Sequence, residues 1–216
     1  DGTGKMTVDA GAILRVYGDS RFDAAVENKG EIEVIGQGTG PDQRGPGVLR
    51  IGGAFSNLGL ITLTSTASQI SQIMVDYGGR FNNNGTGVIK AVEGAGGVRG
   101  VTFGGEMTNA GRITAEAGVT FQFMGVESSS SDKFTNSGQL ELKSGASLEF
   151  YYGEWIHSGG SLTLATNTTV ALVEGTLTLN SDFTMVPAAS WYIEGATVVG
   201  SRKLTVDAGT SLYVRG

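Results

Sequence analysis

Apolar and polar residues alternate with a period of two along almost the whole chain. The alternating stretches are three to six residues long, contain many β-branched and aromatic residues, and are separated by glycine, asparagine and serine. No apolar stripe with the 3.6-residue period of a helix extends over a helical length. The pattern predicts an all-β protein built from many short strands.

One sequence unit recurs along the chain. It begins with an apolar residue, has Asn two positions later and Gly four positions later, and continues as a short strand that starts with Ile or Leu. Clear copies span 26–34, 55–63, 107–115 and 134–142. Imperfect copies begin at Phe81 and at Ile156, where Ser158 stands in place of Asn. The glycines of the unit, at a spacing close to 26 residues, are Gly30, Gly59, Gly85, Gly111, Gly138 and Gly160.

A repeat of this length suits a solenoid of stacked coils. A β-sandwich also has short strands separated by turns, but it needs no Asn-x-Gly at a fixed spacing, whereas stacked coils must all turn their corners alike. We therefore predict a right-handed parallel β-helix over residues 1–216, as a single domain with three short strands in each coil of about 26 residues. About eight coils would form a rod roughly 40 Å long. Segment 5–18 matches segment 203–216 at nine of fourteen positions, so we expect the chain to belong to a longer array.

The corner between two strands explains the Asn-x-Gly pair. Gly adopts the positive φ that a tight corner requires, and Asn side chains on successive coils can hydrogen bond to one another at the strand spacing of about 4.8 Å. We predict an internal ladder, interrupted by Ser158, that consists of Asn28, Asn57, Asn83, Asn109 and Asn136. The predicted inward apolar residues are Ile32, Val34, Ile61, Leu63, Ile89, Ile113, Phe121, Phe123, Leu140, Leu142, Leu148, Phe150, Leu162, Leu164, Leu177 and Leu179.

The unit Asn-x-Gly-x-Ile/Leu-x-apolar, followed by Ala/Ser-Gly and a second short strand, resembles the β-helical repeats of filamentous-haemagglutinin-like and autotransporter-passenger adhesins. The resemblance covers about residues 5–216 and is strongest over 26–164. It implies a rod from a secreted or cell-surface bacterial protein, located outside the cell. The partner that it implies is a glycan or protein on a host or cell surface.

Composition and charge exclude several classes of function. The 216 residues include 36 glycines and no cysteine, so there is no disulfide, thiolate nucleophile or thiolate metal site. The net charge of −6 argues against a nucleic-acid partner, and no stretch approaches the ~18 apolar residues of a spanning helix, so we expect no membrane insertion. Segment 96–101 lacks the Asp of calcium-binding glycine-rich repeats. No metal and no cofactor are predicted.

Paired carboxylates are the first candidate for chemistry. Glycoside hydrolysis requires two of them across a cleft, about 5–9.5 Å apart. Glu31 and Glu33 alternate onto one outward face, and Glu141 and Glu149 are expected to share a face on neighbouring strands. Because outward charges on a solenoid usually serve solvation, we assign no catalytic residue.

An aromatic cluster is the second candidate. Tyr151, Tyr152 and Trp155 are candidate glycan contacts, since flat rings beside polar groups bind sugars well. The alternative is that Tyr151 or Trp155 covers the core where a coil is short. The neighbouring His157 is expected to be a turn or edge residue.

The predicted function is that of a structural or adhesive rod. It would present strand faces and the loops 36–47, 93–100 and 125–133 to a glycan or protein partner. One alternative is a carbohydrate-active β-helix enzyme or a tailspike-like polysaccharide depolymerase. The other is a self-assembling filament or surface-layer subunit, because exposed strand ladders at solenoid ends favour end-to-end stacking.

Overall fold

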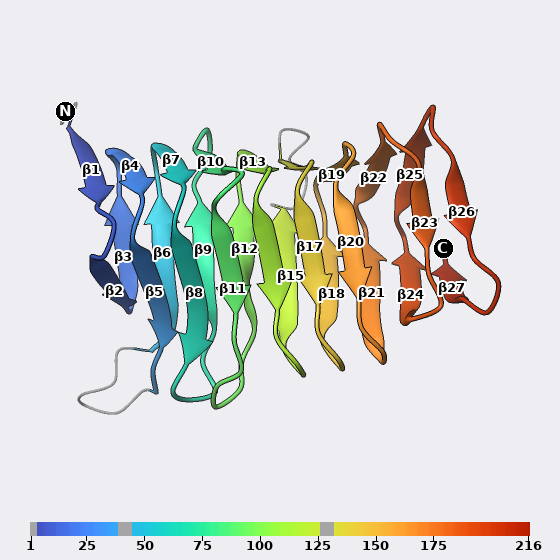
Figure 1. The fold of residues 1–216 in the computed structure, drawn as a ribbon, viewed down its shortest axis with the longest axis horizontal. Helices are drawn as coiled ribbons and strands as arrows, with labels where there is room; N and C mark the ends of the chain where they lie inside the picture. The colour runs from blue at the N-terminus through green and yellow to red at the C-terminus, as the bar shows by residue number, and fades with distance from the viewer. Residues whose placement is uncertain (1–3, 39–44, 126–131) are drawn as a thin grey trace.

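The computed structural model describes residues 4–38, 45–125 and 132–216. These residues form 27 short strands and no helix. The strands pair in parallel, and the chain passes through three sheets in turn to complete each coil. The coils follow one another along the long axis of the molecule (Figure 1). The prediction of an all-β parallel solenoid with three strands per coil is confirmed.

Each of the three sheets contains every third strand in chain order. Sheet 1 contains β1 (Lys5–Val8), β4 (Ala25–Asn28), β7 (Ala54–Asn57), β10 (Arg80–Asn83), β13 (Glu106–Asn109), β16 (Lys133–Asn136), β19 (Glu154–His157), β22 (Thr176–Leu179) and β25 (Thr197–Gly200). Sheet 2 contains β2 (Ile13–Tyr17), β5 (Glu31–Gly36), β8 (Leu60–Ser65), β11 (Val88–Ala91), β14 (Arg112–Ala115), β17 (Gln139–Leu142) and β20 (Ser161–Leu164). Sheet 3 contains β3 (Asp19–Phe22), β6 (Gly47–Ile51), β9 (Ser71–Val75), β12 (Arg99–Phe103), β15 (Thr120–Gly125), β18 (Ser147–Tyr151), β21 (Thr168–Val173), β24 (Ala189–Glu194) and β27 (Ser211–Arg215). A separate pair consists of β23 (Phe183–Met185) and β26 (Leu204–Val206).

The coils contain about 24 residues on average, slightly fewer than the sequence predicts. The central coils have the predicted length, since Arg80 pairs with Glu106, 26 positions later. The later coils are shorter, because Glu154 pairs with Thr176 and Thr176 pairs with Thr197. The repeat therefore tolerates coils of different length as long as the strands stay in register.

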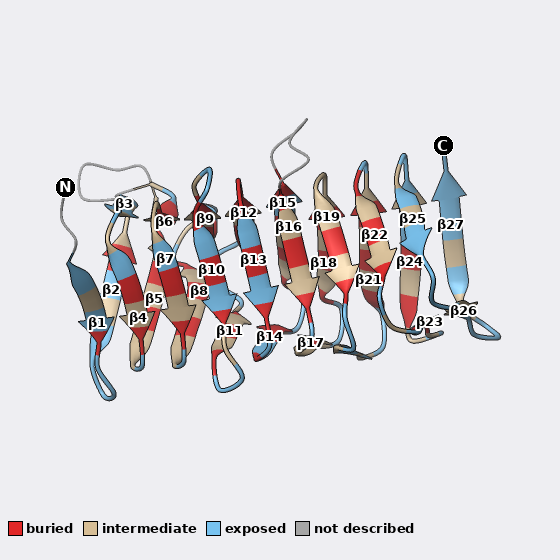
Figure 2. Ribbon diagram, turned by 90° about the horizontal axis from the view of Figure 1, so that it is seen from above, coloured by how far each residue is buried: buried red, intermediate tan, exposed pale blue. Residues whose placement is uncertain are grey.

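Inward side chains from all three sheets form one continuous apolar core. Fourteen of the sixteen predicted inward residues are buried, whereas Leu162 and Leu164 are only half-buried. Both lie on β20, the last strand of sheet 2, so no following strand of that sheet covers them. Figure 2 shows the same trend along the rod, with buried positions on the central strands and an exposed β27.

The repeat glycines lie at the corner between sheets 1 and 2, where the backbones of successive coils approach closely. A Cβ atom on Gly59, Gly111 or Gly138 would overlap the backbone carbonyl of the corner glycine one coil earlier. None of these three glycines has a positive φ, so the predicted conformational role is wrong and close stacking is the physical reason for glycine. In the fourth coil the stacked residue is Gly87 and not the predicted Gly85, because Leu60 pairs with Val88.

The two similar end segments take different places in the solenoid. Residues 5–18 supply β1 in sheet 1 and β2 in sheet 2, whereas residues 203–216 supply β26 and then β27 in sheet 3. The same sequence unit therefore folds around two different corners of the coil.

Candidate functional site

The five predicted asparagines form a hydrogen-bonded ladder inside the solenoid. The Nδ2 atom of each donates to the Oδ1 atom of the next, at 2.8 Å from Asn28, 2.7 Å from Asn57, 2.7 Å from Asn83 and 2.8 Å from Asn109. Each of these four amides also donates to the backbone carbonyl of the first residue in the sheet 2 strand of the next coil, as Asn109 does to Gln139. The ladder thus ties every central coil to its neighbour on the same side of the core.

We expect Asn109→Ala to lower the free energy of unfolding by about 1–3 kcal/mol, because it leaves buried amide groups of Asn83 and Asn136 without their partners. Urea unfolding followed by circular dichroism measures this loss. The matched control is Asn82→Ala on the exposed face of β10, where we expect a change within about 0.5 kcal/mol. Equal stability of Asn109→Ala and the wild type would contradict a stabilising ladder.

The ladder ends at Asn136, and the next inward position is occupied by His157 and not by Ser158. Asn136 pairs in register with His157, so the histidine occupies the next inward position, and this corrects both the predicted break and the predicted edge location. The imidazole is 4 % exposed and packs edge-on against Phe183, with ring centroids 4.9 Å apart. Its Nδ1 atom and the Nδ2 atom of Asn136 are both buried without a hydrogen-bond partner.

Burial lowers the pKa of His157 below its ordinary value of 6.5, while a hydrogen bond to the backbone of Asp182 acts in the opposite direction. The unfolded chain therefore takes up the proton at a higher pH than the folded chain. The stability that neutral His157 contributes is present above about pH 6.5 and is lost as the pH falls.

We expect the free energy of unfolding of the wild type to decrease as the pH falls from about 7.5 to about 5.5. The decrease should be smaller in His157→Leu, which copies Leu179 at the same register position of the next coil. Urea titrations at several pH values measure both slopes. Identical slopes would show that His157 does not titrate on unfolding.

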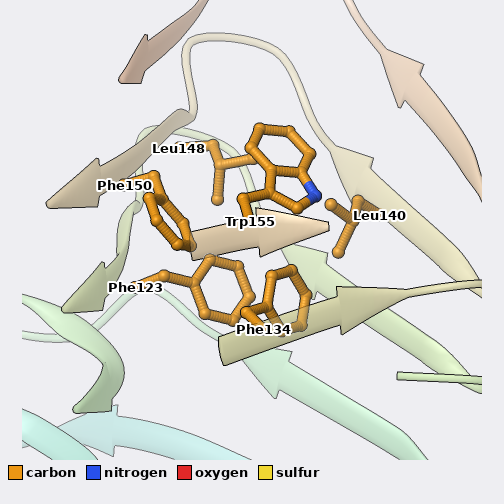
Figure 3. A pocket seen from close by; sticks show the side chains of 6 residues that line it. All are labelled: Phe123, Phe134, Leu140, Leu148, Phe150 and Trp155. Carbon is orange, nitrogen blue, oxygen red and sulfur yellow. The ribbon is translucent and has the colours of Figure 1, made fainter. Parts of the chain in front are cut away.

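Trp155 belongs to the core and not to a glycan platform. It pairs in register with Phe134, is 3 % exposed, and packs against Phe150 and Phe183 with ring centroids 5.9 Å apart in each case. Figure 3 shows it closing a cluster of apolar side chains. The space between them does not admit a water molecule. The prediction that Trp155 contacts a glycan is corrected, because its ring faces are covered.

The other two candidate aromatic residues lie nearer the surface. Tyr151 is half-buried on the outer face of β18, and its hydroxyl donates to Glu149 at 3.2 Å. Burial raises the pKa of Tyr151, and the charge of the neighbouring Glu149 raises it further. Tyr152 follows in the corner, half-buried and with a left-handed φ of 56°. Of the predicted trio, Tyr151 alone lies on a strand face that a large partner could cover.

The predicted loops are described only in part, since residues 39–44 and 126–131 lie outside the described residues. The loop 93–100 folds around Arg99, which is 2 % exposed and donates to the carbonyls of Gly96 and Gly97 at 2.9 Å each. Burial lowers the pKa of this guanidinium. Arg99 therefore organises its own loop.

Of the candidate carboxylates, Glu31 and Glu33 lie on the outer face of one strand, β5, as predicted. Glu141 lies on β17 of sheet 2 and Glu149 on β18 of sheet 3, so the prediction that they share a face is wrong. Glu33 forms an ion pair with Arg15 at 2.6 Å. Glu141 forms an ion pair with Lys143, and the hydrogen bond from Lys143 lowers the pKa of Glu141. Within the described ranges no group of three or more His, Cys, Asp and Glu residues could hold a metal ion. The same ranges contain no helix long and apolar enough to span a membrane.

The outer faces of the three sheets differ in charge. Ion pairs between coils lie on sheets 1 and 2, among them Lys5–Glu27, Arg80–Glu106 and Lys133–Glu154 on sheet 1 and Arg15–Glu33 and Lys90–Glu116 on sheet 2. On sheet 3 they lie near the two ends, as Arg50–Asp19 and Arg215–Glu194. Two outward rows of sheet 3 run from β9 to β21: Gln72, Gly100, Gln122, Glu149, Ala171, and Met74, Thr102, Met124, Tyr151, Val173. Glu149 is the one charged residue in these rows.

A groove opens on this face above β12. Its volume is about 360 Å³. It is lined by Ile70, Gln72, Met74, Val98, Gly100, Val101, Thr102, Gln122 and Met124. The middle strand contributes the small outward residues Gly100 and Thr102, whereas both flanking strands contribute Gln and Met. The longer side chains therefore form two walls around a low floor, and we call this feature the β12 slot.

Two further aromatic features are not predicted by the sequence pattern. Tyr192 and Tyr213 stack on the outer face of sheet 3, with ring centroids 4.8 Å apart and an interplanar angle of 10°. Tyr77, 85 % exposed, stands beside a groove of about 220 Å³ at the corner between sheets 3 and 1. Only the register of the coils could have paired Tyr192 with Tyr213, because they lie 21 positions apart.

The fold and its outer faces define the chain as a parallel β-solenoid of about eight turns. Comparison with known protein families, with curated proteins and with solved structures finds no match.

Proposed function

We propose that this chain is a structural and adhesive rod of a secreted or cell-surface protein, and that it holds a glycan or protein partner on the outer face of sheet 3. The observation that carries the proposal is the charge pattern of the three faces. Ion pairs between coils, which keep a surface hydrated, lie on sheets 1 and 2 and near the two ends of sheet 3, whereas two neighbouring outward rows of sheet 3 contain one charge between β9 and β21.

The part of sheet 3 between β9 and β21 has the size that a partner needs. Five successive strands, at about 4.8 Å per coil, make it roughly 20 Å long. Interface centres are depleted in charged residues and enriched in aromatic residues and Met, and this face combines Met74, Met124 and Tyr151. The stacked coils hold these side chains in one plane without a loop, so binding requires little ordering.

The test compares retention of the purified chain on surface-displayed glycans and on intact cells. We expect saturable binding that is lost when lysines are placed on sheet 3 by the double substitution Met124→Lys and Val173→Lys. The matched control places lysines on the outer face of sheet 1, by Thr108→Lys and Thr135→Lys, and should still bind. No saturable binding by the wild type, or an equal loss in both variants, would contradict the proposal.

A further inference from the structure

We infer that the β12 slot is a binding site for a segment of a neutral glycan. This inference rests on the proposed function and names the partner of one part of the same face. It commits the slot to a ligand with many hydroxyl groups, apolar C–H faces and no charge.

The register of three strands shapes the slot. Gln72, Gly100 and Gln122 are successive partners, as are Met74, Thr102 and Met124. With strands about 4.8 Å apart, the backbones that carry the two walls are about 10 Å apart across the floor. A volume of about 360 Å³ lies within the range of small-ligand sites. The slot follows the direction of β12, so an elongated ligand would cross the rod.

The polar groups of the slot suit hydroxyl groups. Thr102 donates to the amide oxygen of Gln72 at 3.5 Å, and the amide nitrogen of Gln122 donates to Glu149 at 2.7 Å. These bonds leave the amide nitrogen of Gln72 to donate to a ligand and the amide oxygen of Gln122 to accept from one. One wall therefore offers a donor and the other an acceptor.

The apolar groups suit the C–H faces of a sugar ring. Met74 and Met124 provide flexible thioethers on opposite walls, and Ile70 and Val98 line the same groove. Met124 and Ile70 are 36 % and 37 % exposed, so their apolar surface is available to a ligand.

The charges nearby favour a neutral ligand over an acidic one. No lining residue is charged. Glu149 lies one coil beyond the Gln122 wall, and the chain has a net charge of −6, so both would repel a polyanion. Beyond the other wall, Arg50 contacts the Met74 sulfur and is paired with Asp19 at 2.7 Å.

An extended peptide fits the slot less well than a glycan. Peptides that bind sheets by strand addition use unpaired backbone groups at an edge. β12 pairs with β9 on one side and with β15 on the other, so its backbone groups are already used.

The experiment fills the slot with one outward side chain, Thr102→Tyr. The matched control is Thr108→Tyr, which places the same side chain at an exposed threonine on the outer face of sheet 1, outside the proposed binding face. Gly100 is unsuitable, because a Cβ atom there would overlap the backbone carbonyl of Gln122. The probes are immobilised neutral polysaccharides (β-glucan, mannan and galactan), with polygalacturonate as the acidic comparison. Thermal unfolding of both variants checks the fold, and Gln122→Ala serves as a second slot variant.

We expect the wild type to bind at least one neutral polysaccharide and Thr102→Tyr to bind it about tenfold more weakly or worse, with Thr108→Tyr unchanged. If folded Thr102→Tyr and Gln122→Ala both bound the polysaccharide as tightly as the wild type, the slot would be overturned and the proposed adhesive face would stand. Binding of the wild type only to polygalacturonate, or only to proteins on cells, would also overturn the slot alone. A wild type that binds no glycan and no cell surface would overturn the proposed function as well.

Discussion

Gly111→Ala should destabilise the solenoid by about 3 kcal/mol, the upper end of the range for overpacking. A Cβ atom on Gly111 would overlap the backbone carbonyls of Gly87 and Asn84 and would lie 3.0 Å from the amide nitrogen of Asn83. Two of these three neighbours are backbone atoms, so a side-chain rotation cannot relieve the overlap. The coils would have to separate at the point where the asparagine ladder also joins them. Urea unfolding of the variant and the wild type measures the loss.

Gly85→Ala is the matched control, because the spacing of the repeat alone makes Gly85 look equivalent to Gly111. In the structure a Cβ atom on Gly85 meets no heavy atom within 4 Å, and its φ lies outside the left-handed region. We expect a change between zero and a gain of about 1 kcal/mol, since alanine restricts the unfolded chain. A large loss in Gly85→Ala with none in Gly111→Ala would mean that the stacked corner lies at Gly85.

The periodic features of the fold could be predicted from the sequence because each depends on spacing alone. Alternation with a period of two predicts strands, and Asn recurring about 26 positions apart predicts stacked coils. The ladder from Asn28 to Asn136 follows directly, since residues one coil apart occupy the same place.

Register within a single coil could not be predicted where a corner changes length. The sequence pattern places the first apolar residue of the unit at Ile156, but the coil pairs Trp155 with Phe134 and His157 with Asn136, and Gly159 is the extra residue in the corner. A shift of one position moves every side chain of a strand to the other face. In the sequence pattern, that single shift places Trp155 on the outward face and Ser158 at the position of the ladder asparagine.

The candidate binding face was beyond prediction for a different reason. Its residues are each unremarkable in the sequence, and Gln72, Gly100 and Gln122 lie 22 or more positions apart. Coils of unequal length bring them side by side, so the slot follows from the pairing of three particular strands. The aromatic cluster of residues 151–155, by contrast, was conspicuous in the sequence, yet its tryptophan is buried.

Trp155→Ala should lower the free energy of unfolding by about 3–5 kcal/mol, the usual cost of truncating a buried large aromatic residue. The indole is 3 % exposed and bridges two parts of the core, with Phe150 on one side and Phe183 on the other. Its loss would leave a cavity beside a cluster already too tight for water, at a place held by stacked strands that cannot easily collapse. Urea unfolding of the variant measures this cost.

Trp155→Phe distinguishes the contribution of ring packing to stability from that of the indole N–H. The indole N–H is buried without a hydrogen-bond partner, so phenylalanine removes an unsatisfied donor while it keeps much of the ring packing. We expect it to cost less than Trp155→Ala, because phenylalanine leaves a smaller cavity and breaks no hydrogen bond. Tyr151→Ala on the outer face provides the comparison for glycan retention. If Trp155→Ala lost glycan binding at unchanged stability, Trp155 would be a surface platform and its place in the core would be wrong.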